Sequence, residues 1–448
     1  MKLKKVKIMK NVKSIFRIQI LIVTLFCIVN PLFSKGEEVK DQFEKFFKVS
    51  ESDKLVLNMY DADLQINTWS SNEIKLVGEV LISGGSKDDV DKVLNAFKNP
   101  EVVQSAGKIE INTVFSEGSI QILGFYKKTK LSNGETVSVS SIKSTYTIWI
   151  PERIAFNLTS KYNKVKAPSL LGKLNFELYN ADVDMGDFGD NSTFDAKYST
   201  IHIGKGQDVK FDVYDTKLFT DELKKVIIQS KYSSFTCKAV NLLALESYND
   251  KFIIDNLNGI DINAQYTSLN TKGNSNIGKF KLYNCNIDVE DFTKIEYDSK
   301  YSEFTANKVG SFNIKESYND IYEVKEVSDI SCKDSKYNKV NIDLVNTSIY
   351  FPNTYDSSIK IGKVGANFIS FRGGFKYGSV SLATEPAFNY KLICDNTYGE
   401  INYPKDRFKS KPLVYIEKDS KTQFESSTDP NAKCEIRFTA YDMDFTIE

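Results

Sequence analysis

The sequence predicts an all-β fold, a single-stranded parallel β-solenoid with coils of about 17–18 residues, and three observations support this prediction. First, tyrosines recur 16 to 19 residues apart from Tyr162 to Tyr355. Second, two kinds of repeat unit alternate, with a combined period near 35 residues. Third, the units hold short runs typical of β-strands, such as Phe235 to Ala239, and no long helical pattern. A fixed short period is typical of a solenoid, in which each coil buries its apolar face against its neighbours.

The two kinds of unit differ in the residues beside the tyrosine. In the first kind, Lys or Gln precedes it and an apolar residue follows three positions later: Tyr162, Tyr198, Tyr232, Tyr266, Tyr301 and Tyr337. In the second kind, Asn or Asp follows it directly: Asn180, Asp215, Asn249, Asn284, Asn319 and Asp356. Asn and Asp tolerate left-handed backbone and bond their own turn, so we expect them at stacked corners. The alternative is a carboxylate ladder for calcium or catalysis, which the four asparagines among these six residues disfavour.

One unit per coil is the predicted arrangement, with strands stacked in parallel at ~4.8 Å. The twelve tyrosine anchors then imply a rod of roughly 55–60 Å for this segment. We expect Tyr232, Tyr248, Tyr301 and Tyr318 to stack in register as buried, structural ladders rather than as sugar-binding residues.

Residues 1–34 are predicted to be a signal peptide, because a lysine-rich start is followed by an apolar run from Ile18 to Phe33. An uncleaved membrane anchor is the alternative, although the apolar run is short for a membrane span. Phe26 stands where a lipid-attachment site has a small residue, so Cys27 is not expected to carry lipid. The mature chain is therefore expected to be exported, to the periplasm, the outer surface or the medium.

The remaining chain divides into three predicted parts. Residues 35–151 form an N-terminal capping region with the first strands and one short helix, Lys87–Asn99, which Ser86 caps. Residues 152–404 form the β-solenoid repeats. Residues 405–448 form a C-terminal cap, in which Arg437–Ile447 alternates apolar and polar residues as a strand does. Solenoids need such terminal caps because an open end would expose the core.

Charge and cysteine content exclude some functions. The 59 basic residues balance the 59 acidic ones, so no excess of positive charge indicates a nucleic-acid partner. The cysteines after the signal peptide are odd in number, lack a C-x-x-C pair and make a poor disulfide or zinc framework: Cys237, Cys285, Cys332, Cys394 and Cys434. Cys237 shares its phase with apolar positions of other units and is predicted to be a small core residue. The sequence leaves open whether one disulfide joins two of the other four cysteines.

Several short motifs lie in the order of a known family. Tyr60-Asp-Ala-Asp-Leu-Gln-Ile is followed by Thr68-Trp69 and Asn72-Glu73-Ile74, then by a helix, and then by Tyr146-Thr-Ile-Trp-Ile-Pro151 leading into the repeats. This order resembles the putative-adhesin β-solenoid family, which is common in Bacteroidetes and related to the GIN-type adhesin head domains. The repeats depart from many relatives in using Tyr rather than Gly and Asp. The resemblance implies an exported β-solenoid and transfers no catalytic residue.

The residues from which a catalytic site could be built are few. His202 is the only histidine, and its neighbours Ile201 and Ile203 place it outward on a strand. The densest acidic cluster is Asp182, Asp184 and Asp187, for which a solvated face is the favoured interpretation. We therefore assign no catalytic, cofactor-binding or metal-binding residue, and we expect no cofactor.

Two function classes remain. The favoured one is a non-enzymatic envelope or surface protein, an adhesin or scaffold that acts as a monomer on an envelope polymer or a surface protein. The alternative is a carbohydrate-active β-helix enzyme, a polysaccharide hydrolase or lyase. Enzymes of that kind wall a cleft with inserted loops, and the nearly constant spacing from Tyr162 to Tyr355 leaves little room for them.

Overall fold

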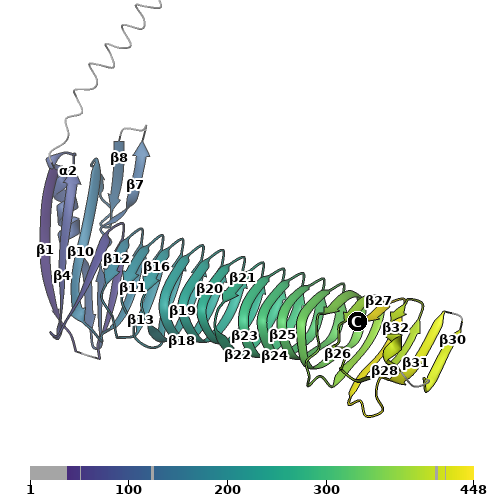
Figure 1. Ribbon diagram of the computed structural model, residues 1–448. Helices are drawn as coiled ribbons and strands as arrows, with labels where there is room; N and C mark the ends of the chain where they lie inside the picture. The colour runs from purple at the N-terminus through teal and green to yellow at the C-terminus, as the bar shows by residue number, and fades with distance from the viewer. Residues whose placement is uncertain (1–37, 51, 123–125, 409–411, 419) are drawn as a thin grey trace, which may run out of the picture.

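The computed structural model describes residues 38–50, 52–122, 126–408, 412–418 and 420–448. Stacked parallel coils form a β-solenoid of about 13 turns, which confirms the predicted fold class. The coils build a long rod with a taller antiparallel sheet at its N-terminal end and a hairpin at its C-terminal end (Figure 1). The predicted signal peptide, including Cys27, lies outside the described residues.

Each coil in the middle of the rod is one long, bent strand followed by a two-residue turn. β18 (Lys217–Lys231), β19 (Ser234–Tyr248) and β20 (Lys251–Gln265) show this best. Parallel pairing places Phe235 between Leu218 and Phe252, so the register advances by one repeat unit per coil. The prediction of one unit per coil is confirmed, whereas the short runs expected within a unit are joined into a single strand in these coils.

The burial pattern explains how one strand can wrap a core. In β18 the alternation of buried and exposed residues breaks at Asp221–Glu222 and again at Lys224–Lys225. Two successive outward residues mark a corner, because the inward direction changes there. The third corner is the turn after the strand, at Tyr232 and Ser233. Each coil therefore has three sides, and its inward residues pack against those of the coils above and below.

The other coil strands follow the same stacking. Towards the N-terminus the coils are split into shorter strands, and towards the C-terminus they are continuous: β11 (Ala155–Lys161), β12 (Lys164–Ala167), β13 (Leu174–Tyr179), β14 (Asp182–Met185), β15 (Ser192–Lys197), β16 (Thr200–Ile203), β17 (Gly206–Tyr214), β21 (Ser268–Thr271), β22 (Asn274–Tyr283), β23 (Asn286–Lys300), β24 (Glu303–Tyr318), β25 (Ile321–Lys336), β26 (Lys339–Ile361) and β27 (Ser370–Leu382).

The N-terminal end combines a first coil with an antiparallel sheet. β2 (Lys54–Tyr60) and β3 (Asp63–Trp69) pair in parallel with β11 and β12 and form the first coil. β4 (Glu73–Ser83) pairs antiparallel with β1 (Glu38–Lys48) on one side and with β10 (Ser141–Pro151) on the other. The remaining strands here are β5 (Glu101–Ser105), β6 (Lys108–Asn112), β7 (Ser116–Ile122), β8 (Tyr126–Leu131) and β9 (Thr136–Ser138).

The predicted helix is present as α2 (Lys87–Lys98). The Ser86 hydroxyl accepts a hydrogen bond from the Asp89 N–H at 3.1 Å, as an N-cap residue does. Val90, Val93 and Phe97 are buried, and Phe97 lies edge-on to Phe43 of β1 with 5.1 Å between ring centroids. The helix therefore buries its apolar stripe against the antiparallel sheet at this end.

The C-terminal end does not stack in chain order. β32 (Cys434–Tyr441) and β33 (Asp444–Ile447) pair in parallel with β27 on one side and with β28 (Tyr390–Thr397) and β29 (Ile401–Asn402) on the other. β31 (Lys421–Ser427) and β30 (Val414–Lys418) then continue antiparallel from β28, and η1 is a short 3-10 helix (Lys405–Arg407). The alternation expected for Arg437–Ile447 is present, but these residues fill an inner coil, and β28, β31 and β30 lie outside them.

Candidate functional site

A continuous row of tyrosine rings runs along one corner of the rod. Each ring contacts the ring of the neighbouring coil edge to face, with centroids 5.3 to 6.0 Å apart. We call this row the tyrosine ladder, and in stacking order it contains Tyr60, Tyr162, Tyr179, Tyr198, Tyr214, Tyr232, Tyr248, Tyr266, Tyr283, Tyr301, Tyr318, Tyr337, Tyr355, Tyr377, Tyr441 and Tyr398. Fourteen of these sixteen side chains are exposed. The ladder is thus an outer surface of the protein.

The staggered geometry follows from the alternation of the two repeat units. In one coil Tyr232 itself occupies the left-handed turn position, with φ 57°. In the next coil Asn249 occupies that position, also with φ 57°, and Tyr248 stands one residue before it. The register places Tyr248 beside Lys231, so consecutive rings are offset by one residue. This offset lets the edge of one ring meet the face of the next, which is the arrangement that aromatic pairs prefer.

The prediction of left-handed turn residues is confirmed for the second kind of repeat unit, but it did not foresee the left-handed tyrosines of the first kind. All six Asn and Asp residues that follow the second-kind tyrosines have positive φ, between 46° and 57°. The six first-kind tyrosines, exemplified by Tyr162 at 62°, also have positive φ. A left-handed conformation costs a residue with a Cβ roughly 1–2 kcal/mol, so this was not expected of tyrosine. The predicted in-register stacking is confirmed, but burial is wrong: Tyr232 is 46% exposed.

A seam of buried polar side chains lies inside the rod beneath the ladder. At most of the turns, the residue after the left-handed position donates its backbone N–H to the side chain of its counterpart in the next coil. Thr216 donates to the Ser233 hydroxyl at 3.1 Å, and Ser233 donates to Asp250 Oδ1 at 2.6 Å. Further along, Ser302 donates to Asp320 Oδ1 at 2.7 Å, and Asp320 to Asn338 Oδ1 at 2.8 Å. The seam satisfies turn N–H groups that would otherwise be buried without partners.

Two aspartates in the seam are buried. Asp250 accepts hydrogen bonds from the Ser247 hydroxyl at 2.6 Å and from the Tyr248 N–H at 3.1 Å. Asp320 accepts from the Ser299 and Ser317 hydroxyls at 3.0 and 2.7 Å. Burial raises the pKa of both carboxyl groups above the usual value, although these hydrogen bonds act in the opposite direction. The two groups are enclosed and serve the turns, so they are not accessible to a ligand.

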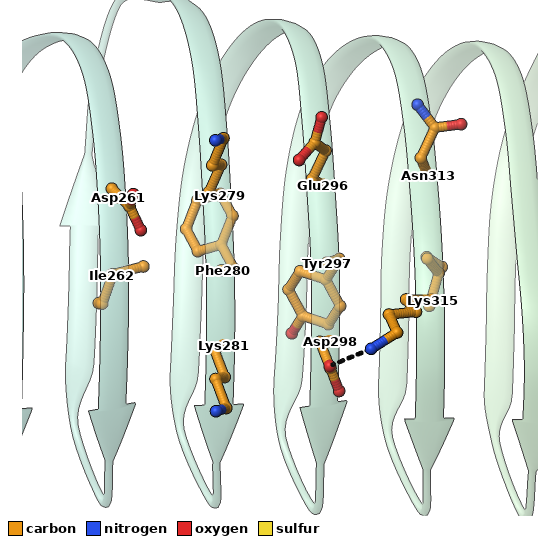
Figure 2. A pocket seen from close by; sticks show the side chains of 11 residues that line it. Asp261, Ile262, Lys279, Phe280, Lys281, Glu296, Tyr297, Asp298, Asn313 and Lys315 are labelled. Carbon is orange, nitrogen blue, oxygen red and sulfur yellow. Dashed lines mark ion pairs between the residues drawn. The ribbon is translucent and has the colours of Figure 1, made fainter.

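The side of the rod next to the ladder is hollowed along its length. We call this side the groove face, and in β20 its outward residues are Asp261, Asn263 and Gln265. Three open hollows of about 570, 450 and 470 Å³ lie on it in succession, over β15–β20, β20–β24 and β25–β32. Figure 2 shows the middle hollow, where Lys279 and Glu296 lie in one row and Lys281 and Asp298 in another.

The residues that the sequence singled out lie on two neighbouring strands and in a bend, and they face outward. Asp182 and Asp184 are exposed on β14, and Asp184 pairs in register with His202 of β16. The His202 ring lies flat on Phe219 of the next coil, with centroids 4.4 Å apart. Asp187 accepts a hydrogen bond from the Lys205 N–H at 2.8 Å, which fixes a bend between coils. The described part of the chain contains no group of three or more His, Cys, Asp or Glu residues placed to hold a metal ion.

All five cysteines among the described residues are buried and free, so no disulfide joins them. Cys237 lies inside the coil, 2% exposed, which confirms its predicted role as a core residue. Burial raises the pKa of the Cys237 thiol to about 12. A thiol that stays protonated is a poor nucleophile and metal ligand.

Comparisons with known proteins add little to this description. No protein-family model matches the chain, and no curated protein does either. Among solved structures, the chain is similar to one described as a putative cell adhesion protein from Clostridium sporogenes ATCC 15579, at 11% identity and a TM-score of 0.17, over 91% of this chain and 99% of that one. Another is described as a putative lipid binding protein from Parabacteroides distasonis ATCC 8503, at 10% identity and a TM-score of 0.18, over 77% and 94%. Neither superposes closely on this rod.

Among the residues that the structure describes, no helix is long and apolar enough to span a membrane.

Proposed function

We propose that this chain is an exported, non-enzymatic β-solenoid of the cell envelope or surface, which acts as an adhesin or scaffold by presenting its long sides. The observation that carries this proposal is the tyrosine ladder, because it repeats the same aromatic group on every coil along the rod, exposed in fourteen of its sixteen members. A surface with many equal, weak contact points binds an extended partner far more tightly than any single point does. The partner is therefore an envelope polymer or another surface protein, and the chain acts as a monomer.

The regular spacing of the coils supports the same function. Between β11 and β25 each left-handed turn residue follows its counterpart in the previous coil after 17 or 18 residues, and the strand pairing has one bulge, at Tyr297 and Asp298. Long loops that could wall a deep active-site cleft are not inserted between these coils. The resemblance of the N-terminal motifs to the putative-adhesin β-solenoid family, with its Bacteroidetes members, favours the same role.

The experiment combines location, adhesion and turnover. In cells that express the chain, fractionation and protease shaving should place it in the envelope, accessible from outside. Beads coated with purified protein should adhere to those cells or to isolated envelope more than beads coated with a control protein do. Recovery only from the cytoplasm would contradict the proposal. A glycan degradation screen tests the alternative function. If the purified protein degrades a glycan and this activity is lost on replacing Asp182, Asp184 or Asp187, the chain is a carbohydrate-active enzyme instead.

A further inference from the structure

The three hollows together form one track. The first ends on β20, where the second begins, and the second ends on β24, the direct neighbour of β25, where the third begins. The strand register places the first two on the same side of the rod, because Asn263 of the first hollow pairs with Lys281 of the second. Ladder tyrosines such as Tyr248 and Tyr355 line the first and the third hollow, so these two share the ladder edge. Twelve neighbouring coils contribute, which at ~4.8 Å per coil gives a track of roughly 50 Å. A track of this length suits a linear polymer better than a small molecule.

The charges along the track balance. The middle hollow is lined by three acids and three lysines: Asp261, Glu296, Asp298, Lys279, Lys281 and Lys315. The first hollow has two acids and two lysines, and the third has one acid and two lysines. A groove that binds a polyanion or a polycation concentrates charge of the opposite sign. This track carries acids and lysines in similar numbers, so its charge matches a polymer with no net charge.

The chemistry of the lining suits hydroxyl groups. Apart from the tyrosines, most outward side chains of the track are carboxylates, amides and ammonium groups, with the Thr439 hydroxyl in the third hollow, and together they offer many donors and acceptors. Asn263 and Lys281 face outward side by side on neighbouring strands, and no hydrogen bond or ion pair involving their side chains occurs in the described part of the chain. Sugar rings present hydroxyls at their edges and C–H groups on their faces. The hydroxyls can bond to these polar rows, and the C–H faces can pack on the exposed tyrosines.

From these observations we infer that the groove face binds a neutral, unbranched polysaccharide lying parallel to the rod axis. This inference rests on the proposed surface function and names the class of its partner. The alternation of the two repeat units gives the ladder a period of two coils, ~9.6 Å. An extended glycan with a two-sugar repeat would therefore present the same groups to every second coil. Each contact is weak, and affinity increases with the number of coils that one glycan chain spans.

The test is affinity electrophoresis of the purified full chain in native gels that contain one polysaccharide each. The neutral probes are hydroxyethyl cellulose, galactomannan and dextran, and the charged probes are polygalacturonate and chitosan. At least one neutral probe should retard the protein, and the retardation should change less than about twofold between about 0.05 and 0.5 M NaCl, because no net charge is screened.

Two matched double variants locate the site. The half-buried Asp298 and the exposed Lys315 form an ion pair across neighbouring coils on the groove face, with 4.0 Å between Asp298 Oδ2 and Lys315 Nζ. Glu323 and Lys339 form a similar exposed pair on another side of the rod, with 3.7 Å between Glu323 Oε1 and Lys339 Nζ. Replacing each pair by alanines should leave both proteins folded, since exposed pairs add little stability. The Asp298→Ala/Lys315→Ala variant should lose at least about threefold in affinity, and the control variant should match the wild type.

Three outcomes would overturn the inference: no retardation by any neutral probe, retardation only by a charged probe and only at low salt, or equal affinity of the two variants. The adhesion and location experiments above are independent of this one. A protein found on the surface that adheres to cells but binds no neutral glycan would keep the proposed function and reject the glycan. If the protein binds a neutral glycan but is never exported, the proposed function is rejected and the inference about glycan binding stands.

Discussion

The energetic role of the tyrosine ladder can be tested by comparing two tyrosines of the same coil. Tyr301 follows β23 in the left-handed position and is 43% exposed, and its ring meets those of Tyr283 and Tyr318 at 5.6 and 5.4 Å. Each edge-to-face contact contributes ~0.5–1.5 kcal/mol. Truncation in Tyr301→Ala therefore costs ~1–3 kcal/mol. Ala and Tyr tolerate the left-handed backbone about equally, so the backbone adds nothing to this difference.

Tyr297 supplies the buried reference. It is 2% exposed and its ring lies among those of Phe280, Phe304, Phe312 and Tyr322. Tyr297→Ala should cost ~3–5 kcal/mol, as truncation of a buried aromatic residue does.

A third variant separates ring contacts from backbone strain. Tyr301→Asn removes the same contacts but places at the turn the residue type that neighbouring coils use there, such as Asn319 with φ 55°. Asn tolerates this conformation better, so Tyr301→Asn should be ~1 kcal/mol more stable than Tyr301→Ala.

The assay is urea unfolding followed by circular dichroism, with the midpoint compared at constant slope because a changed slope would indicate a changed unfolding unit. If Tyr301→Ala lowers the free energy of unfolding as much as Tyr297→Ala does, the Tyr301 ring contributes as a buried ring would. The argument that the ladder rings are stabilised only by their edge-to-face contacts would then fail. If it costs nothing, the edge-to-face contacts are not stabilising. If Tyr301→Asn is the less stable of the two turn variants, the account of the turn is wrong.

Three further predictions concern the interior and the turns. Burial raises the pKa of Asp320, so its protonated form favours folding below the usual value near pH 4, and this contribution is lost as the pH rises through the raised pKa. Asp320→Asn should therefore gain stability relative to the wild type as the pH rises above about 4, measured by urea unfolding, and a difference that stays constant with pH would contradict this. Cys237, with its pKa at about 12, should resist an alkylating reagent in the native protein and react fully in urea, so rapid native labelling would refute its burial. Asn319→Ala should lower stability by ~1 kcal/mol and Asn319→Gly by less, because only Gly keeps the left-handed turn unstrained; equal losses would refute this.

The repeat period made the coil predictable, but not its finer structure. Spacing and alternation were enough to predict the parallel stack, because only neighbouring coils can bury residues such as Phe235 and Phe252. The Asn and Asp residues at the turns were predictable from their local preference for left-handed backbone. Tyrosine at this position was not predictable, because its contacts with adjacent coils outweigh the backbone strain that sequence rules treat as decisive.

The candidate site was predictable only in part. His202 and the aspartates of β14 were expected to face outward, and they do. The polar seam was missed, because Ser233 and Asp250 read as ordinary turn residues and their partners lie one coil away. The groove face was missed as well, since the strand pattern shows which residues point outward but not how deeply a side is hollowed.

The insertion of β32 and β33 between β27 and β28 has a consequence for how the protein is made. In the middle of the rod, paired residues of neighbouring coils are one repeat apart in the sequence, as Leu218 and Phe235 are. Phe371 of β27 pairs instead with Ile436, which comes much later in the chain. Closing this longer loop is slower, because entropy opposes contacts that are distant in the chain. A chain that folds from its N-terminus during synthesis would therefore form its coils in order as far as β27 and then pause. Its apolar end would stay open until residues 434–447 arrived, which makes that interval the period in which a chaperone would be needed.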